Sequence, residues 1–274
     1  MEVEIQDMPP KHPYPLDLVG VKGVKYLVRI RSPRGIIEFP VTYNAYVKLS
    51  PGRRAVHLSR NIEAFIEALV ESEKKGKESL EALMEEVAVK LLGKHEYTEY
   101  ARAELELEHF VETGRTLEPV NVRISIEAWR NNGKRWTLTL GVTGITACPH
   151  AQVNISKKLN TPVNVTPTHM QRARIEASIS FTEKRVYNIE GIALKLLKAF
   201  SQPTRTLLKK DDEARLIIEA HRNPKLVEDV ARDALSILEE VIEPPAEICV
   251  KATSYESIHP YNVFAERCMV LNKQ

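Results

Sequence analysis

The feature that most constrains the fold is an order of strand and helix patterns that occurs twice along the chain. In the first half, apolar and polar residues alternate in two neighbouring stretches, apolar residues then recur at helical spacing in two more, and alternation returns in a final pair. These six stretches lie at about residues 24–31, 36–49, 62–70, 80–91, 104–111 and 122–128. Such an order predicts a ββααββ module, in which an antiparallel sheet packs two helices on one face.

The second half repeats this order, with a long irregular loop after its first strand. Its strand and helix patterns lie at about residues 136–145, 174–181, 189–200, 211–222, 225–241, 248–252 and 261–272. We therefore predict an α+β protein built from two ββααββ modules. The predicted divisions are a proline-rich, extended N-terminal arm at 1–20, a first module at 21–131 and a second module at 132–274.

The composition indicates an ordinary globular protein and argues against two classes of partner. The chain has 39 Lys and Arg against 37 Asp and Glu. The formal charge of +2 does not by itself indicate binding to nucleic acid. No apolar run approaches the roughly 18 residues of a membrane span, and the N-terminus lacks the features of a signal peptide. Three cysteines, a small and odd number, fit a reducing compartment better than a disulfide framework. We expect a cytoplasmic protein.

Three scattered residues have the chemistry of a catalytic metal site. Cys148 follows a predicted strand, His169 lies in the irregular loop, and Glu213 lies in the first turn of a predicted helix. Donors of these types, gathered from separate elements, suit a metal that keeps one position open for water. Each also has an ordinary interpretation: a small buried hydrophobe, a solvated histidine, and an acid that complements the helix dipole. Cys249 and Cys268 lie within apolar strand patterns and are predicted to be structural.

A Glu-x-x-His pair, Glu256 and His259, follows the predicted strand at 248–252. Pro260 prevents a simple helical continuation, so both side chains can line one edge of a pocket. Carboxylate and imidazole are common groups for general acid–base chemistry. The spacing alone is weak evidence, because such pairs are frequent by chance.

Six short motifs, taken in order, resemble the signatures of the type IB GTP cyclohydrolases. They are His57-Leu-Ser-Arg60, Thr146-Ala-Cys-Pro149, His169-Met-Gln-Arg172, Lys210-Asp-Asp-Glu213, Leu226-Val-Glu-Asp229 and Glu256-Ser-Ile-His259. The resemblance runs from about Val19 to Tyr261 and is strongest to the archaeal branch of the family, which serves methanopterin synthesis. It implies the tunnelling fold, a ββααββ module present twice per subunit, in agreement with the pattern of the elements.

The resemblance assigns roles to individual residues. Cys148, His169 and Glu213 resemble the metal site, with Fe²⁺ expected and Mn²⁺ or Zn²⁺ as alternatives. Glu256 and His259 resemble the catalytic carboxylate and imidazole, and Cys148 is counted with them. The substrate-binding residues implied are Glu228, at the guanine edge, and the triphosphate candidates His57, Ser59, Arg60, Arg172, Lys209 and Lys210. A solvated surface is the alternative interpretation for the triphosphate candidates.

One position departs from the family pattern. Where family members often carry a second cysteine, two residues after the first, this chain has His150. An extra ligand, a proton carrier and no role at all are the open interpretations of that histidine.

Together these features predict a metal-dependent GTP cyclohydrolase. It would add hydroxide at guanine C8, release formate and reclose a 7,8-dihydroneopterin phosphate, as the 2′,3′-cyclic phosphate or the triphosphate. GTP is the expected partner of a homodimer or homotetramer that binds neither nucleic acid nor membrane. One alternative is a tunnelling-fold nitrile reductase, in which a cysteine is the nucleophile, NADPH supplies hydride and no metal is needed. The other is a purine- or pterin-binding module without turnover.

Overall fold

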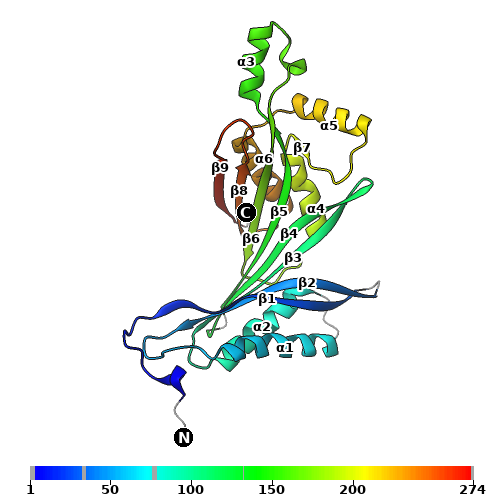
Figure 1. The fold of residues 1–274 in the computed structure, drawn as a ribbon. Helices are drawn as coiled ribbons and strands as arrows, with labels where there is room; N and C mark the ends of the chain where they lie inside the picture. The colour runs from blue at the N-terminus through cyan, green and yellow to red at the C-terminus, as the bar shows by residue number, and fades with distance from the viewer. Residues whose placement is uncertain (1–3, 33–34, 76–78, 132, 273–274) are drawn as a thin grey trace. The chain divides into compact units, whose positions relative to one another are not determined.

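The computed structural model describes residues 4–32, 35–75, 79–131 and 133–272. Its first half contains β1 (Leu16–Ser32), β2 (Gly35–Leu49), α1 (Leu58–Lys75), α2 (Leu80–Lys94), β3 (Tyr100–Thr113) and β4 (Thr116–Trp129). Its second half contains β5 (Lys134–Ala147), α3 (Pro149–Leu159), β6 (Met170–Phe181), α4 (Ile189–Leu196), β7 (Gln202–Pro203), α5 (Lys210–Arg222), α6 (Val227–Val241), β8 (Ala246–Ser254) and β9 (Val263–Leu271). Short 3₁₀ turns lie at Ile5–Asp7, Val163–Val165 and Leu197–Ala199. Figure 1 follows this order along the chain, which confirms the two predicted ββααββ patterns and adds elements to the second.

The strands form one hydrogen-bonded sheet. Their order is β1-β2-β3-β4-β5-β6-β8-β9, and the short β7 pairs with β5. The pairs β1–β2, β2–β3, β5–β7 and β8–β9 are antiparallel. β1 begins at Leu16, so this strand takes in the end of the predicted N-terminal arm. Parts of the predicted turns at 32–35 and 131–134, namely residues 33–34 and 132, lie outside the described residues.

The chain divides into two compact units that interleave along the sequence. Unit 1 comprises Met1–Glu108, Arg123–Leu138 and Ser180–Val186, and unit 2 comprises His109–Val122, Thr139–Ile179 and Tyr187–Gln274. The long strands β3, β4, β5 and β6 contribute to both units. Each unit has helices and buried residues of its own.

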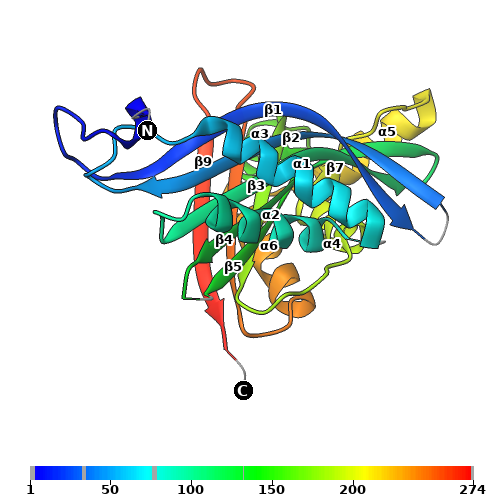
Figure 2. The same cartoon turned by 90° about the horizontal axis from the view of Figure 1, so that it is seen from below.

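In unit 1, α1 and α2 lie side by side against one face of the strands, as Figure 2 shows. Alternate residues of β2 point into this core, and Tyr43 stacks on Phe65 of α1 with 4.1 Å between the ring centroids. A buried polar network ties the helices to the strands: the amide of Asn61 donates to the carbonyl of Ala45 (3.2 Å), and its Oδ1 lies 2.6 Å from Nε2 of His95. The core of unit 1 is thus aromatic and aliphatic, and its buried polar residues Asn61 and His95 are hydrogen-bonded.

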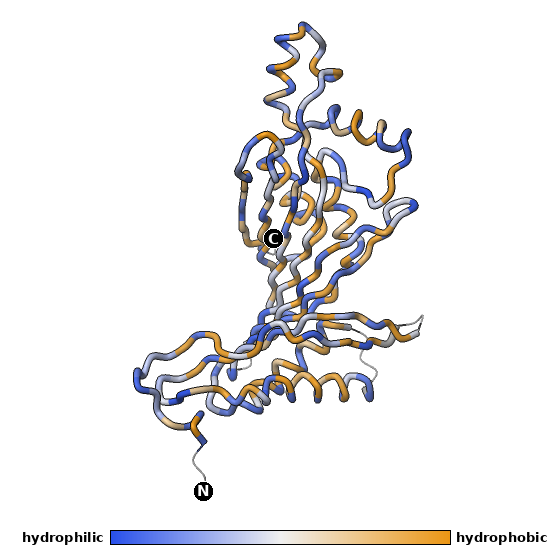
Figure 3. The backbone as a smooth tube through the Cα atoms, in the orientation of Figure 1, coloured by the Kyte–Doolittle hydropathy of each residue, from blue (hydrophilic) through white to orange (hydrophobic). Residues whose placement is uncertain are grey.

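In unit 2, α6 packs against β8, β9 and α4. Its buried residues recur at helical spacing, and the buried residues of β8 alternate along the strand. Figure 3 shows the matching alternation of orange and blue along helices and strands. Burial of one face of each element explains why periodicity alone predicted them. Among the described residues, no helix is long and apolar enough to span a membrane.

Two sequence-based expectations are corrected by the structure. The loop expected to be irregular contains α3, whose buried residues are the polar Gln152 and Ser156, so no apolar stripe marked the helix. Cys249 and Cys268 were expected to be structural residues in a chain whose few cysteines fit a reducing compartment better than a disulfide framework. They face each other across β8 and β9, with 4.0 Å between their Cα atoms, and form a disulfide.

Candidate active site

The candidate site in unit 2 begins where β5 ends. Cys148 is the N-cap of α3, and its Sγ accepts a hydrogen bond from the backbone N–H of Ala151 at 3.4 Å. Pro149 at the first helical position has the backbone angle that a helix start requires. The N–H of Cys148 donates to the carbonyl of His169 (3.2 Å), and Thr168 Oγ1 donates to the carbonyl of Cys148 (2.8 Å). The backbone segments that carry the Cys148 thiol and the His169 imidazole are therefore hydrogen-bonded to each other.

Gln171 connects His169 to Glu256. Its Oε1 lies 2.8 Å from Nδ1 of His169, and its Nε2 lies 3.4 Å from Oε1 of Glu256 and 3.1 Å from Oγ1 of Thr146. Ser254 Oγ donates to the same oxygen of Glu256 at 2.7 Å. The side-chain amide of Gln171 thus contacts both His169 and Glu256, which are 87 positions apart in the sequence. The family pattern assigns the first of these residues to metal binding and the second to catalysis.

This network determines which nitrogen of His169 carries the proton. An ionised carboxylate only accepts hydrogen bonds, so the NH₂ group of Gln171 faces Glu256. The carbonyl oxygen of Gln171 must then face Nδ1 of His169, which is therefore the protonated nitrogen. Among the described residues, Nε2 of His169 has no hydrogen-bond partner. Its lone pair is available to a metal or a proton.

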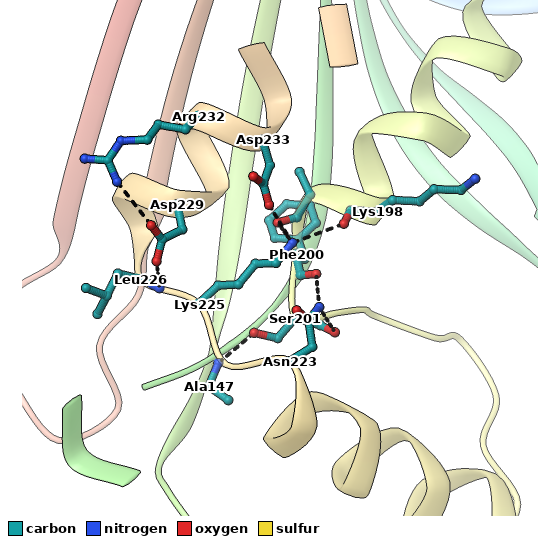
Figure 4. Close-up of polar contacts among 11 residues, drawn as sticks. Ala147, Lys198, Phe200, Ser201, Asn223, Lys225, Leu226, Asp229, Arg232 and Asp233 are labelled. Carbon is teal, nitrogen blue, oxygen red and sulfur yellow. Dashed lines mark hydrogen bonds and ion pairs between the residues drawn. The ribbon is translucent and has the colours of Figure 1, made fainter. Parts of the chain in front are cut away.

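The first turn of α6, which carries Glu228, is anchored at the end of β5. The N–H of Lys225 donates to the carbonyl of Ala147 (2.9 Å), and the N–H of Ala147 donates to Oγ of Ser201 (3.1 Å). Lys225 Nζ also binds Asp233 at 2.7 Å. Figure 4 shows these contacts converging on the segment that precedes α6. Glu228 itself is exposed, so its carboxylate is open to a ligand.

Two predicted site residues lie outside the Gln171 network. His259 is exposed in the segment between β8 and β9, where its ring stacks on Tyr261 with 5.0 Å between centroids. Glu213 is exposed in the first turn of α5. Within the described residues, neither side chain makes a hydrogen bond to His169, Gln171 or Glu256. Their assignment to the site stays a prediction.

The expected metal donors fit a borderline divalent metal in part. A thiol and an imidazole with a free Nε2 have suitable chemistry. In the described part of the chain, the sets of three or more donors within 4.8 Å of one another are Glu4–Asp7–His57 and Cys249–Glu266–Cys268, and both sulfurs of the second set belong to the disulfide. The donor atoms of Cys148, His169 and Glu213 are therefore not all gathered within one chain.

The predicted phosphate-binding residues divide between the units. His57, Ser59 and Arg60 belong to unit 1, whereas Arg172, Lys209 and Lys210 belong to unit 2 and are exposed. The ring nitrogens of His57 lie 3.1 Å from a carboxylate oxygen of Glu4 and 3.4 Å from one of Asp7. Arg60 donates to the carbonyl of Lys94 at 3.1 Å.

His150, the position that departs from the family pattern, is exposed on α3. Its Nε2 lies 3.0 Å from Nδ2 of Asn154. Since an amide nitrogen donates, this nitrogen of His150 is an acceptor that the helix itself occupies.

Sequence reasoning missed Gln171, Thr146 and Ser254. None has acid–base or metal-binding chemistry of its own, so none attracted attention as a candidate. Gln171 follows His169 by two residues at the start of β6, and in a strand this spacing places two side chains on the same face. That spacing was the available signal.

Comparison with known proteins identifies the class and then the family. The model of the family described as type I GTP cyclohydrolase folE2 matches residues 3–265. A relative named GTP cyclohydrolase MptA from Aeropyrum pernix is 37% identical over 273 residues, covering 96% of this chain and 94% of the relative. The protein of the same name from Pyrococcus abyssi is 34% identical over 277 residues, covering 97% and 99%. The chain is an enzyme of the GTP cyclohydrolase class. It belongs to the type I GTP cyclohydrolase (folE2) family.

A solved structure with a similar fold is the uricase from Arthrobacter globiformis. It aligns over 94% of both chains with a TM-score of 0.56 and 9% sequence identity. At this identity the likeness concerns the fold alone. It confirms the predicted tandem tunnelling fold, with antiparallel strands and helices.

Proposed function

We propose that this protein is a metal-dependent GTP cyclohydrolase of pterin synthesis that hydrolyses the guanine imidazole at C8 and releases formate. Membership of the family and the full-length similarity to proteins named GTP cyclohydrolase MptA support the reaction class. They favour it over the nitrile reductase and the binding module without turnover. The structural observation that best supports the proposal is that the side chain of Gln171 contacts both His169 and Glu256.

The residues of the site have distinct proposed roles. Cys148 Sγ and His169 Nε2 would hold the metal, Fe²⁺ in the first instance, with Mn²⁺ or Zn²⁺ as alternatives. When bound, such a metal supplies hydroxide near neutral pH, because it lowers the pKa of its water. Gln171 keeps Nδ1 of His169 protonated and so directs Nε2 outward. Glu256, held at Oε1 by Ser254 and Gln171, retains Oε2 for a proton of the reacting purine.

Two further residues act on the substrate in this proposal. Glu228 accepts hydrogen bonds from N1 and N2 of guanine, a pattern that adenine does not offer. His259 carries protons as the C8–N9 bond breaks. The product we propose is the 2′,3′-cyclic phosphate of 7,8-dihydroneopterin, as the similarity to the archaeal relatives suggests.

We further propose a homo-oligomer in which Glu213 of one copy completes the metal site of another. Its exposure on α5, away from the Gln171 network, supports this arrangement. The test mixes two inactive variants, His169→Ala and Glu213→Gln. If the sites are shared and the two variants associate at random into dimers, the mixture regains up to about a quarter of wild-type activity. Two variants that stay inactive after co-refolding, although they co-elute, would contradict the shared site.

The test of the function is product analysis. Protein purified without oxygen and reconstituted with Fe²⁺ or Mn²⁺ should release formate from GTP, and mass spectrometry should find the cyclic phosphate. GTP binding without formate release would exclude the cyclohydrolase. Formate together with a triphosphate product would retain the reaction class and exclude the proposed phosphate outcome.

A further inference from the structure

A cavity of about 590 Å³ opens in unit 2 between the β3–β4 turn and the start of α5. Its lining comes from the turn at 113–116, the segment at 202–209 and the first turns of α5. The volume lies within the range of small-molecule sites. It is therefore large enough for a nucleotide-sized or smaller ligand.

The lining of this cavity is cationic. Arg115, Arg205, Lys209 and Arg215 face two acids, Asp212 and Glu219, so four positive against two negative groups leave a formal charge of +2. The amide of Gln202 donates to Glu219 at 3.3 Å, which satisfies part of that carboxylate. The charge balance favours an anionic ligand.

Three of the four cations have no side-chain partner among the described residues, and Arg205 is partly engaged because its charge also lies near Glu118. Within the described residues, Arg115, Lys209 and Arg215 make no ion pair and no side-chain hydrogen bond. Arg205 uses one Nη1 donor for the carbonyl of Thr113, at 3.2 Å, and keeps its other donors. Guanidinium groups that no protein acid occupies keep their paired donors free for the oxygens of a phosphate.

Hydrogen bonds to Glu118 join the β3–β4 hairpin to the segment that carries Arg205. Glu118, only 6% exposed, accepts hydrogen bonds from the N–H of Thr206 (2.9 Å), from Oγ1 of Thr206 (2.8 Å) and from Oγ1 of Thr116 (2.7 Å). Burial alone would raise the pKa of Glu118, but these hydrogen bonds outweigh it and lower the pKa, so the carboxylate stays ionised. Gly114, with φ of 78°, allows the two-residue turn that puts Arg115 at its tip. The hairpin and the segment carrying Arg205 are thus fastened together.

We propose that this cavity is a binding site for an oligophosphate group. Guanidinium forks match phosphate oxygens in pairs, and cations from three separate segments suit a ligand with several adjacent negative charges better than a single carboxylate. The ligand is either the triphosphate of the substrate, in which case the inference rests on the proposed function, or a separate phosphorylated molecule. Arg115, Arg205 and Arg215 are the residues that this site adds to those predicted from the sequence.

The direct test measures binding of inorganic tripolyphosphate by calorimetry. Arg115→Ala and Arg215→Ala should each weaken binding by about tenfold or more, because each removes a charge-assisted pair. Arg222→Ala is the matched control: it removes an exposed arginine at the other end of α5, outside the cavity. Thermal unfolding of each variant confirms folding. Unchanged binding in the Arg115→Ala/Arg215→Ala double variant, or equal weakening in Arg222→Ala, would overturn the site.

A kinetic test then separates the two sources of phosphate. If the substrate occupies the cavity, the double variant should raise KM for GTP by about tenfold or more with kcat nearly kept. An unchanged KM together with lost tripolyphosphate binding assigns the cavity to a separate ligand. Because tripolyphosphate binding needs no turnover, this site is tested even if the wild-type protein fails to release formate from GTP.

Discussion

Two histidines, His95 in unit 1 and His169 in unit 2, are each oriented by a neighbouring amide but differ in what is left free. His95 is fully buried, and both its nitrogens are engaged, Nε2 by Asn61 at 2.6 Å and Nδ1 by the hydroxyl of Tyr97 at 2.8 Å. His169 is half-buried, and only Nδ1 is engaged. A histidine with two partners stabilises a core, whereas one held at a single nitrogen presents the other to a ligand.

The electrostatic setting strengthens this contrast. Burial lowers the pKa of His95 to about 4, and the nearby basic groups, Arg60 first among them, add to the effect. The amide of Asn61 donates to Ala45, so its Oδ1 accepts from Nε2 of His95. His95 is therefore a neutral imidazole whose proton and lone pair are both used within the protein.

The largest effect is expected from removing His169. His169→Ala should lower kcat for formate release by about 10²–10⁴, the usual range for losing a positioned catalytic or metal-binding imidazole. The midpoint of thermal unfolding should change little, because the side chain is half-buried and its contacts, to Gln171 and to the exposed Ser257, involve Nδ1 alone. Formate assays and unfolding curves on one preparation make the measurement. Full activity in this variant would remove His169 from the site.

The converse variant should affect stability. His95→Ala leaves a cavity and strips Asn61 and Tyr97 of a partner, so the free energy of unfolding should fall by about 2–4 kcal/mol. Denaturant unfolding measures the loss, and kcat of the folded fraction should remain near the wild-type value. A variant as stable as the wild type, or one that is stable but inactive, would reverse the assignment of the two histidines.

The sequence predicted the framework of this contrast but not its details. Apolar periodicity located the strands and most helices, because one face of each is buried, and it missed α3, whose buried residues are Gln152 and Ser156. The motifs pointed to His169 and Glu256. The amide that joins them was invisible, since it depends on β6 and the end of β8 lying side by side in the sheet. His95 lies in no motif. Its two hydrogen bonds, to Asn61 and Tyr97, form only in the folded core, so the sequence did not indicate them.

Gln171 gives a smaller and more specific effect than either histidine. Gln171→Ala removes the bond that fixes the protonated nitrogen of His169, so activity or metal affinity should fall by about 10–100-fold. Gln171 acts through its neighbours, so the informative readout is the split between metal affinity, which reports the contact with His169, and kcat at saturating metal, which reports the contact with Glu256. Gln171→Glu keeps the acceptor towards His169 and loses the donor towards Glu256, which separates the two contacts. Unaltered metal affinity and kcat in both variants would reduce Gln171 to a packing role.

The most gradual effect is the contribution of His95 to the pH dependence of stability, which is spread over several pH units. Because the pKa of His95 is lowered to about 4 in the folded state, from an ordinary value of 6.5, the unfolded chain binds a proton between these values and the folded chain does not. The free energy of unfolding should therefore fall as pH drops from about 6.5 towards 4, by at most about 1.4 kcal/mol per pH unit, and should not depend on this group above that window. Unfolding measured across the window in the wild type and in His95→Asn isolates the contribution, since other groups are common to both. Parallel curves would mean that His95 is protonated in the folded state, which contradicts the two-partner arrangement and with it the contrast to His169.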